Sequence, residues 1–458
     1  MVNMLRRMEK FYKVAIILID LVLINLAYIV AFLLKFDGNL PDFNFSPYIQ
    51  AMPFITIAAL VYFDVFGLLK FFRKSLYDTA VSIIFVILLL GITTVAIAYF
   101  GQGFSFPRSV LLLAPAFQFV LLLVWNGFVL MIRKQLTGQG SMMVLGNADE
   151  IKGIIEKVNH ALSRTNLNIK HIYQPQDMDK AVKKLKDVDE VLICPGIPDD
   201  QKMEIISRCI GRKKIVYVIP QLFEISLLHS RLVQFEDVPA FMIDRLGLTI
   251  EQRFFKRIFD IVFSIIGIIL TSPVMLVSAI LIKATSKGNV IFTQERVTNN
   301  NRVFDIYKFR TMYEGAEKDT GPVLSGVDDP RVTSVGRFLR KFRIDELPQL
   351  FNVLWGEMSI VGPRSERPYF VEQFIKDIPD YKYRNEVKAG ITGYAQILGN
   401  YDTLPEDKLR YDLLYIKNYS LLLDIKLILQ TLKVVITGNH VTYKSFNDSL
   451  KEQSKLPV

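Results

Sequence analysis

The stretch that decides the fold is FFKRIFDIVFSIIGIILTSPVMLVSAILI, residues 254–282. Its apolar part, residues 258–282, is long enough to cross a hydrocarbon layer of roughly 30 Å as a straight helix. Near its centre stands Thr271-Ser272-Pro273. A proline inside a helix removes one backbone hydrogen bond and bends the helix, and Ser272 can satisfy a carbonyl that the bend frees. The stretch therefore permits either a full crossing or a helix that enters the membrane and returns.

Basic residues on both flanks favour the second alternative. Arg253, Lys256 and Arg257 stand before or within its start, Lys283 and Lys287 follow it, and ten more Lys or Arg occur from Arg296 to Arg343. A true crossing would export this charge, against the preference of cationic loops for the cytoplasm. We therefore expect a broken, re-entrant helix with its break at Ser272 and Pro273 and both ends on the cytoplasmic face.

Four further apolar stretches fill the first third of the chain and are each long enough to cross a bilayer. They are approximately Tyr12–Leu34, Ile49–Leu69, Leu76–Phe100 and Val110–Ile132. Most cations gather before the first stretch, between the second and third, and after the fourth, which places both ends of this bundle in the cytoplasm. Asp20 and Asp64 lie within it. We interpret them as structural or assembly residues, with an ion path as the alternative.

The pattern changes between Ser141 and about Pro220, where short β-branched runs alternate with amphipathic segments. Such alternation predicts a parallel sheet with helical crossovers. The first turn, Gly146-Asn147-Ala148-Asp149-Glu150, lacks the glycines of a dinucleotide fingerprint, and its carboxylates would repel a pyrophosphate. We interpret this module as regulatory or for assembly, with cofactor binding as the weaker alternative.

The composition agrees with a membrane protein. The chain has 458 residues, 51% of them hydrophobic, a mean hydropathy of +0.29 and a net charge of +10. The cations cluster near carboxylates and membrane segments, which favours an anionic membrane or a phosphate-rich substrate and argues against nucleic acid. Cys194 and Cys209 have no metal-ligand spacing and are expected to be ordinary thiols. No cleavable signal is expected, because the first apolar stretch is long and lacks a cleavage site.

The chemistry is expected in Arg340-Lys341-Phe342-Arg343-Ile344-Asp345-Glu346-Leu347-Pro348-Gln349-Leu350. Pro348 fits the first turn of a helix, so a helix should begin near Asp345. A plain helix cap would explain Asp345 alone. However, Lys308-Phe309-Arg310 precedes this segment and Val361-Gly362-Pro363-Arg364 follows it, and cations on both sides suit a phosphate. A carboxylate that attacks a diphosphate usually needs Mg²⁺, for which Glu346 beside Asp345 is the candidate ligand.

Residues 253 to about 438 resemble the bacterial sugar transferase family, the monotopic polyprenyl-phosphate sugar-1-phosphate transferases. The matching motifs are Ser272-Pro273, Lys308-Phe309-Arg310-Thr311-Met312, Asp345-Glu346-Leu347-Pro348-Gln349-Leu350, Val361-Gly362-Pro363-Arg364, Gly390-Ile391-Thr392-Gly393-Tyr394-Ala395-Gln396, and Asn418-Tyr419-Ser420 with Asp424. Four helices and a Rossmann-like module before this segment are similar to the layout of large family members. Tyr394 stands where many relatives carry Trp, a change that we expect to be tolerated.

The resemblance implies an inner-membrane enzyme that moves a hexose-1-phosphate from a UDP-hexose to undecaprenyl phosphate and releases UMP, as the first membrane step of exopolysaccharide, capsule or O-antigen synthesis. Asp345 would form a covalent phosphosugar intermediate. Asp345 and Glu346 would be the catalytic residues and Mg²⁺ ligands. The substrate- and phosphate-binding residues would be Lys308, Arg310, Arg340, Arg364 and Gln396. Glucose or galactose is the expected sugar, and a homodimer is compatible with the extra module.

The expected fold class is therefore membrane α plus α/β, in three domains. These are a four-helix transmembrane domain (1–138), a Rossmann-like domain (139–245), and a monotopic catalytic domain with the re-entrant helix (246–458). One alternative is a nucleotide-sugar dehydratase or epimerase, but it would need a GxGxxG turn and a Tyr-x-x-x-Lys pair, and the sequence has neither. The other is a membrane scaffold that senses a nucleotide, which leaves the Asp345 cluster unexplained.

Overall fold

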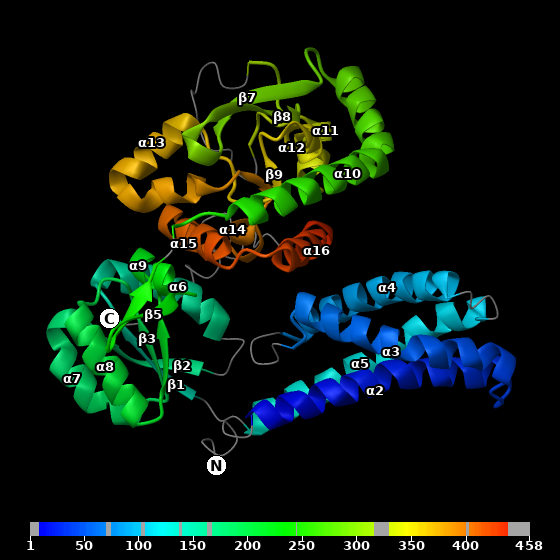
Figure 1. The fold of residues 1–458 in the computed structure, drawn as a ribbon, viewed down its shortest axis with the longest axis horizontal. Coiled ribbons are helices and arrows are strands. Elements are labelled where there is room, and N and C mark those ends of the chain that lie inside the picture. Colours follow the sequence, from blue (N-terminus) through cyan, green and yellow to red (C-terminus); the bar gives the residue numbers. More distant parts are fainter. Residues whose placement is uncertain are drawn as a thin grey trace. The chain divides into compact units, whose positions relative to one another are not determined.

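The computed structural model describes residues 9–69, 75–101, 106–136, 140–162, 167–243, 245–315, 329–399 and 403–437. The chain forms two compact units, Met1–Ile219 and Pro220–Val458 (Figure 1). The cations whose positions predict the orientation of the first helices include Arg6, Arg7, Lys70, Arg73 and Lys74, which lie outside the described residues.

The first unit begins with four long apolar helices, which confirms the helical N-terminal region. They are α2 (Glu9–Lys35), α3 (Asp42–Val65), α4 (Leu76–Phe100) and α5 (Arg108–Leu136). Each is long and apolar enough to cross a membrane, and among the described residues α10 (Ile250–Thr285) is the fifth such helix. The four pack on one another through small and aromatic residues such as Ala27, Ala31 and Phe63, while large apolar side chains such as Leu88 and Val124 remain exposed, as lipid-facing residues would.

Hydrogen bonds between side chains cross the interior of this helical bundle. Asn126 Nδ2 donates to Asp20 Oδ1 at 2.9 Å, and both residues are buried. The hydroxyls of Tyr28 and Thr94 lie 2.9 Å apart. Polar pairs of this kind hold membrane helices together because lipid offers them no partner. The contact supports a structural interpretation of Asp20.

The rest of the first unit confirms the parallel α/β module. Its strands β1 (Gly140–Leu145), β2 (Leu167–Tyr173), β3 (Glu190–Ile193) and β4 (Ile215–Val218) are all parallel, in the order β2-β1-β3-β4. Helices α7 (Met178–Lys184) and α8 (Asp199–Gly211) bury one sheet face, and α6 (Ala148–Leu162) covers the other, because alternate β1 residues point to opposite cores.

Glu150 occupies the turn where such modules usually bind a nucleotide phosphate. The backbone N–H groups of Gly196 and Asn147 donate to its carboxylate at 2.9 Å and 3.2 Å. The Glu150 carboxylate accepts hydrogen bonds from these N–H groups, so the chain's own negative charge occupies the donors that a phosphate would use.

The second unit has a main hydrophobic core, to which many short elements contribute, and a smaller cluster formed by Ile282, Phe309 and Leu339. Two antiparallel hairpins are β5 (Arg231–Phe235) with β6 (Val238–Met242), and β7 (Ile291–Val297) with β8 (Val303–Phe309). β9 (Ser359–Val361) and β10 (Gly390–Thr392) are parallel. The helices after α10 are α11 (Ser334–Lys341), α12 (Gln349–Trp355), α13 (Pro368–Asp377), α14 (Tyr394–Leu398), α15 (Pro405–Lys417) and α16 (Leu421–Thr437).

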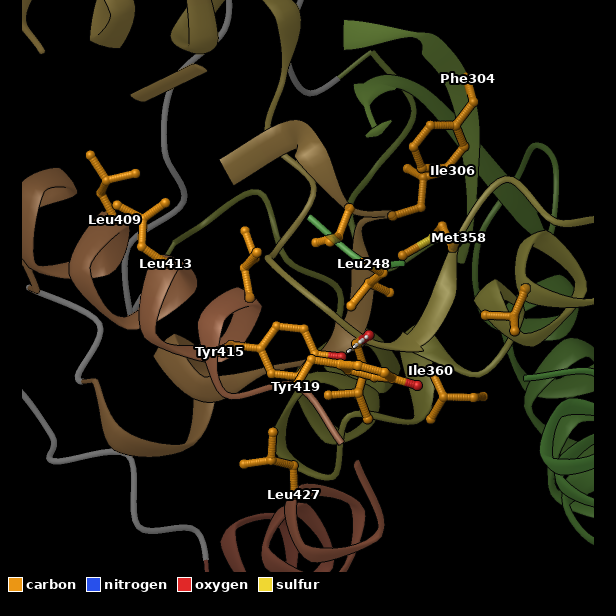
Figure 2. Packing of buried hydrophobic residues seen from close by; sticks show 14 of the residues in the cluster. Leu248, Phe304, Ile306, Met358, Ile360, Leu409, Leu413, Tyr415, Tyr419 and Leu427 are labelled. Carbon is orange, nitrogen blue, oxygen red and sulfur yellow. Dashed lines mark hydrogen bonds between the residues drawn. The ribbon is translucent and has the colours of Figure 1, made fainter. Parts of the chain in front are cut away.

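The core of this unit gathers residues that are far apart in the sequence. Figure 2 shows Tyr415 and Tyr419 from the α15 end beside Ile360 of β9, with Leu427 of α16 next to them. The Tyr415 hydroxyl donates to the Val361 carbonyl at 3.2 Å. Ile225 from α9 (Leu222–Leu227) belongs to the same core, so the segment just after Ile219 packs with the second unit.

Helix α10 is bent but continuous across Pro273 (Figure 1), whereas the sequence predicted a break there. Pro273 cannot donate to the Ile269 carbonyl, and Ser272 Oγ donates to that oxygen at 2.9 Å instead. Thr271 Oγ1 likewise donates to Gly267 O at 2.7 Å. Since side chains replace the lost backbone bond, the helix bends without unwinding.

Both ends of α10 pack on the same globular unit. Near its start, Asp260 Oδ1 accepts hydrogen bonds from Ser359 Oγ at 2.9 Å and Ile360 N at 3.0 Å. Near its end, Ile282 is buried against Phe309 of β8 and Leu339 of α11. The residues between carry exposed apolar side chains, including Ile269 and Leu270. Ile268 and Met275, nearer the middle of α10, also pack on this unit, so the helix contacts it at both ends and between them.

Candidate active site

Asp345 and Glu346 lie on a tight helical turn, η5 (Ile344–Glu346), which leads through Pro348 into α12. The sequence predicted a helix start here, and the turn begins one residue earlier. Arg343 precedes it with φ +57°, a left-handed conformation that costs energy for a residue with a side chain. Both carboxyl side chains are buried. Two buried acids in a strained turn need strong compensation.

Three cations compensate Glu346. Lys308 Nζ lies 2.9 Å from Oε1, Arg364 Nη2 lies 3.2 Å from the same atom, and Arg343 Nη1 lies 3.5 Å from Oε2. Burial raises the pKa of Glu346, but the charges of Lys308, Arg364 and Arg343 outweigh burial and hold the pKa well below its ordinary value. Glu346 is therefore a carboxylate in the folded protein.

Asp345 is in the opposite situation. Its Oδ1 is buried and has no hydrogen-bond partner within the described part of the chain. Burial and the negative charge of Glu346 raise the pKa of Asp345, against the opposing charges of Lys308, Arg340 and Arg343. An unpartnered buried carboxylate oxygen is costly, and such groups in native proteins usually have a functional explanation. The two adjacent acids thus differ: cations neutralise Glu346, whereas Asp345 keeps Oδ1 without a partner among the described residues and so available for reaction.

The predicted phosphate-binding residues fall into two groups. Lys308, Arg340 and Arg364 gather around the two acids, with Arg340 Nε also donating to Thr311 Oγ1 at 2.8 Å. Arg310 instead donates through Nη2 to Ser286 O at 3.0 Å and to Ser286 Oγ at 2.8 Å, at the end of α10. Gln396 Nε2 donates to Ile391 O at 2.8 Å, and its buried Oε1 has no partner among the described residues.

The residues present fit a Mg²⁺ ion of the kind expected from the sequence. No group of three or more His, Cys, Asp or Glu at metal-binding positions occurs in the described part of the chain. Mg²⁺ commonly takes only one or two carboxylates and completes its coordination with water and substrate phosphates. Asp345 and Glu346 are the two candidate carboxylates, and of the Glu346 oxygens Oε2 is the less engaged, with a 3.5 Å contact to Arg343. The donor set therefore suits an ion that arrives together with a phosphate.

Asn352 positions Lys308 and was missed in the sequence. This fully buried residue of α12 donates through Nδ2 to Asp305 O at 2.8 Å, and its Oδ1 accepts from Tyr307 N at 3.0 Å. Both backbone groups belong to β8, directly before Lys308. Asn352 therefore fixes β8 against the helix that follows the two acids. Nothing in the local sequence pattern distinguishes it from an ordinary helical Asn.

Arg384 positions Arg364 in a comparable way. It is buried, forms a 2.9 Å ion pair with Asp412 on α15, and donates to the Arg364 carbonyl at 2.8 Å. Gly362, two residues before Arg364, lies so close to the opposite chain that an added Cβ would be 2.3 Å from Lys388 O. This close approach explains the glycine of the Val-Gly-Pro-Arg motif.

Helix α10 is joined to the same site by charged side chains. Arg257 donates to Val353 O and Leu354 O, both at 2.7 Å, at the end of α12. Lys256 forms a buried 2.6 Å ion pair with Asp424 of α16. Cations at the last carbonyls of a helix stabilise it. The apolar helix and the turn that bears the two acids therefore form one framework.

Comparison with known proteins agrees with this arrangement. The family model described as bacterial sugar transferase matches residues 251–438, which include α10, both acids and every cation named above. A Bacillus subtilis (strain 168) protein, provisionally named an undecaprenyl-phosphate N-acetylgalactosaminyl 1-phosphate transferase, is 46% identical over 157 residues, which are 34% of this chain and 78% of that protein. The chain belongs to the bacterial sugar transferase family.

Longer members of the bacterial sugar transferase family match over the same part. The UDP-N-acetylgalactosamine-undecaprenyl-phosphate N-acetylgalactosaminephosphotransferase of Aeromonas hydrophila is 48% identical over 188 residues, 40% of this chain and 44% of that protein. The UDP-glucose:undecaprenyl-phosphate glucose-1-phosphate transferase of Klebsiella pneumoniae is 40% identical over 250 residues, 53% of this chain and 54% of that protein. The chain thus spans about half the length of these curated relatives.

Proposed function

We propose that the protein transfers a hexose-1-phosphate from a UDP-hexose to undecaprenyl phosphate and releases UMP. The observation that carries the proposal is the pair of buried acids, in which three cations hold Glu346 while Asp345 Oδ1 has no partner among the described residues. Family members named as transferases of this kind support it.

The reaction proceeds in two displacements. Asp345 Oδ1 attacks the sugar-linked phosphorus of the donor, an Asp–O–P bond forms, and the bond to the bridging oxygen breaks with its electron pair leaving on UMP. A phosphate oxygen of the lipid then attacks the same phosphorus, and the Asp345 carboxylate is released. Covalent catalysis divides one transfer between two anions into two easier steps.

The cations around the two acids lower the repulsion between anions. Lys308 and Arg364 already neutralise Glu346, and they lie beside the carboxylate that attacks. Arg340 adds a charge close enough to lower the pKa of Asp345 against the effects of burial and of Glu346. Mg²⁺, when held by Asp345 and Glu346, would supply Lewis-acid stabilisation of the phosphate oxygens.

The four N-terminal helices would cross the bacterial inner membrane, and α10 would enter and leave on the cytoplasmic face. Two observations support re-entry. Asp260 near the start of α10 and Ile282 near its end pack on one unit, and a crossing helix would place these ends on opposite sides. Twelve Lys or Arg residues from Lys283 to Arg343 would otherwise be exported. Donor nucleotide sugars are then supplied on the same side as Asp345.

The decisive experiment is UMP release by the full-length protein with undecaprenyl phosphate and a panel of UDP-sugars. We expect turnover with one hexose donor, with UDP-glucose and UDP-galactose as first candidates and UDP-N-acetylgalactosamine included because relatives carry that name. Asp345→Asn should abolish turnover while the protein stays folded. Substantial UMP release by that variant would exclude Asp345 as the nucleophile, and a wild-type protein inert on every donor would refute the function. The proposed product would begin an exopolysaccharide, capsule or O-antigen.

A further inference from the structure

A second group of charges lies next to the two acids, and the mechanism above uses only one of its members, Arg364. It surrounds the segment Arg364–Glu366, which follows β9. Arg296 of β7 donates to Ser365 O at 3.0 Å, and its Nη1 lies 3.8 Å from Glu366 Oε2. From the other side, Arg384 holds the Arg364 carbonyl and pairs with Asp412. Lys408 lies one helical turn before Asp412 on the same face of α15, and it interacts electrostatically with Glu366, Arg364 and Arg384.

Positive charge exceeds negative charge in this group. Four cations, Arg296, Arg364, Arg384 and Lys408, share two carboxylates, and one of these, Asp412, is taken by Arg384. Arg364 is also shared with Glu346. Lys408 forms no ion pair within 4 Å in the described part of the chain. Lys408 is therefore left without a paired carboxylate among the described residues, and the ion pair of Arg296 with Glu366 is long at 3.8 Å.

Arg296 shows the consequence most clearly. Its Nε is buried and has no hydrogen-bond partner within the described residues. Burial and the neighbouring charge of Arg364 lower the pKa of Arg296 to about 10. A guanidinium has five donor N–H groups in a planar fork that matches the geometry of carboxylates and phosphates. The missing partner is therefore expected to be negatively charged.

Arg364 joins this group to the catalytic acids, because it contacts Glu346 and interacts electrostatically with Glu366. A ligand with two linked phosphates could thus place one at Asp345 and the next at Arg364 and Arg296. We expect the lipid to arrive from the α10 side, because Ile344, next to Asp345, packs against the cluster that contains Ile282 near the end of α10. Helix α15, which carries Lys408, packs instead on α9, α14 and η6 (Pro379–Glu386).

We infer that Arg296 and Lys408, together with Arg364, form a second anion subsite that binds the nucleotide-side phosphate of the donor. The inference rests on the proposed function and adds to it a direction: the nucleoside points toward α15, and the acceptor phosphate approaches from the α10 side. UMP, the leaving group, would be retained by this subsite after the first displacement.

The test is UMP binding by the full-length protein in detergent, measured by calorimetry without turnover. Lys408→Gln and Arg296→Lys should each weaken UMP binding about tenfold, the effect of one lost charge-assisted hydrogen bond. Both should raise the KM for the UDP-hexose and leave the KM for undecaprenyl phosphate unchanged. Glu366→Gln, which removes the competing carboxylate, should tighten UMP binding. Lys417→Gln removes the same charge elsewhere on α15 and should have no effect.

The outcomes separate the two proposals. UMP affinity and donor KM equal to wild type in both Lys408→Gln and Arg296→Lys would overturn the subsite, even if the wild type turns over. A rise in the acceptor KM alone would overturn the direction, because the subsite would then belong to the lipid phosphate. A wild type that binds UMP in this manner but releases none from any donor would leave the subsite in place and refute the proposed reaction.

Discussion

Asn352→Leu should loosen the active site while preserving side-chain volume. Asn352 is fully buried and makes three side-chain hydrogen bonds, to Asp305 O at 2.8 Å, from Tyr307 N at 3.0 Å, and to Glu357 Oε2 at 2.7 Å. A buried polar group left without its partner costs about 1–3 kcal/mol. Asp305 is exposed and Glu357 is half-buried, so water can replace two of the three lost bonds. We therefore expect Asn352→Leu to lower the free energy of unfolding by about 2–4 kcal/mol.

For a unit of this size, that loss lowers the thermal midpoint by roughly 5–12 °C. Trp355 reports the change directly, because its ring packs edge-to-face on Tyr307 at 5.5 Å, and a Trp125→Phe background would isolate its fluorescence. The kcat for UMP release should fall about tenfold or more, since Lys308 follows the freed part of β8. Asn418→Leu is the matched control: its side chain only donates to Leu414 O within an exposed turn. A variant Asn352→Leu with the wild-type midpoint and kcat would refute the positioning role.

Three further predictions concern the acids, the second unit and the membrane helix. Glu346→Gln should weaken both activity and the dependence on Mg²⁺. Because the charge of Glu346 raises the pKa of Asp345, the substitution should also move the acid limb of the pH–kcat/KM profile to lower pH. An unchanged metal titration and an unchanged acid limb would contradict this prediction. A truncated protein that starts at Pro220, in detergent, should still release UMP, and a truncated protein that folds but is inactive would count against assigning the chemistry to the second unit. A single cysteine at Lys287 should resist an impermeant outside reagent in intact cells, whereas Pro273→Ala should expose a fraction of it; labelling without that substitution would exclude re-entry.

The sequence predicted those features that depend on local pattern. The length of the apolar stretches identified the four N-terminal helices, and the alternation of β-branched runs with amphipathic segments identified the parallel module; both are confirmed. The helix start at Asp345 followed from the restricted backbone of Pro348. The bend of α10 followed from Pro273, but its continuity depends on the Ser272 hydroxyl reaching the Ile269 carbonyl. Local chemistry was sufficient in each of these cases.

The remaining features depend on contacts between distant residues. Asn352 pairs with β8 residues 45 and 47 positions away, and Arg384 pairs with Asp412 28 positions away. No helical or strand period relates such pairs. Lys308 and Arg310 were expected to act together, yet β8 ends at Phe309, so Arg310 leaves the strand and contacts Ser286. The end of the strand at Phe309 therefore separates the contacts of Lys308 from those of Arg310.

The anchoring of both ends of α10 on one unit also affects how the protein responds to its lipid surroundings. A helix that crosses the bilayer must match its hydrophobic thickness, and it tilts or deforms the lipid when acyl chains are lengthened. Helices α2, α3, α4 and α5 are of the length at which such mismatch is felt. In the proposed re-entrant arrangement, the apolar surface of α10 would engage one leaflet only and would have no second interface to match. Longer acyl chains would therefore strain the N-terminal helices while the surface beneath Asp345 stays the same.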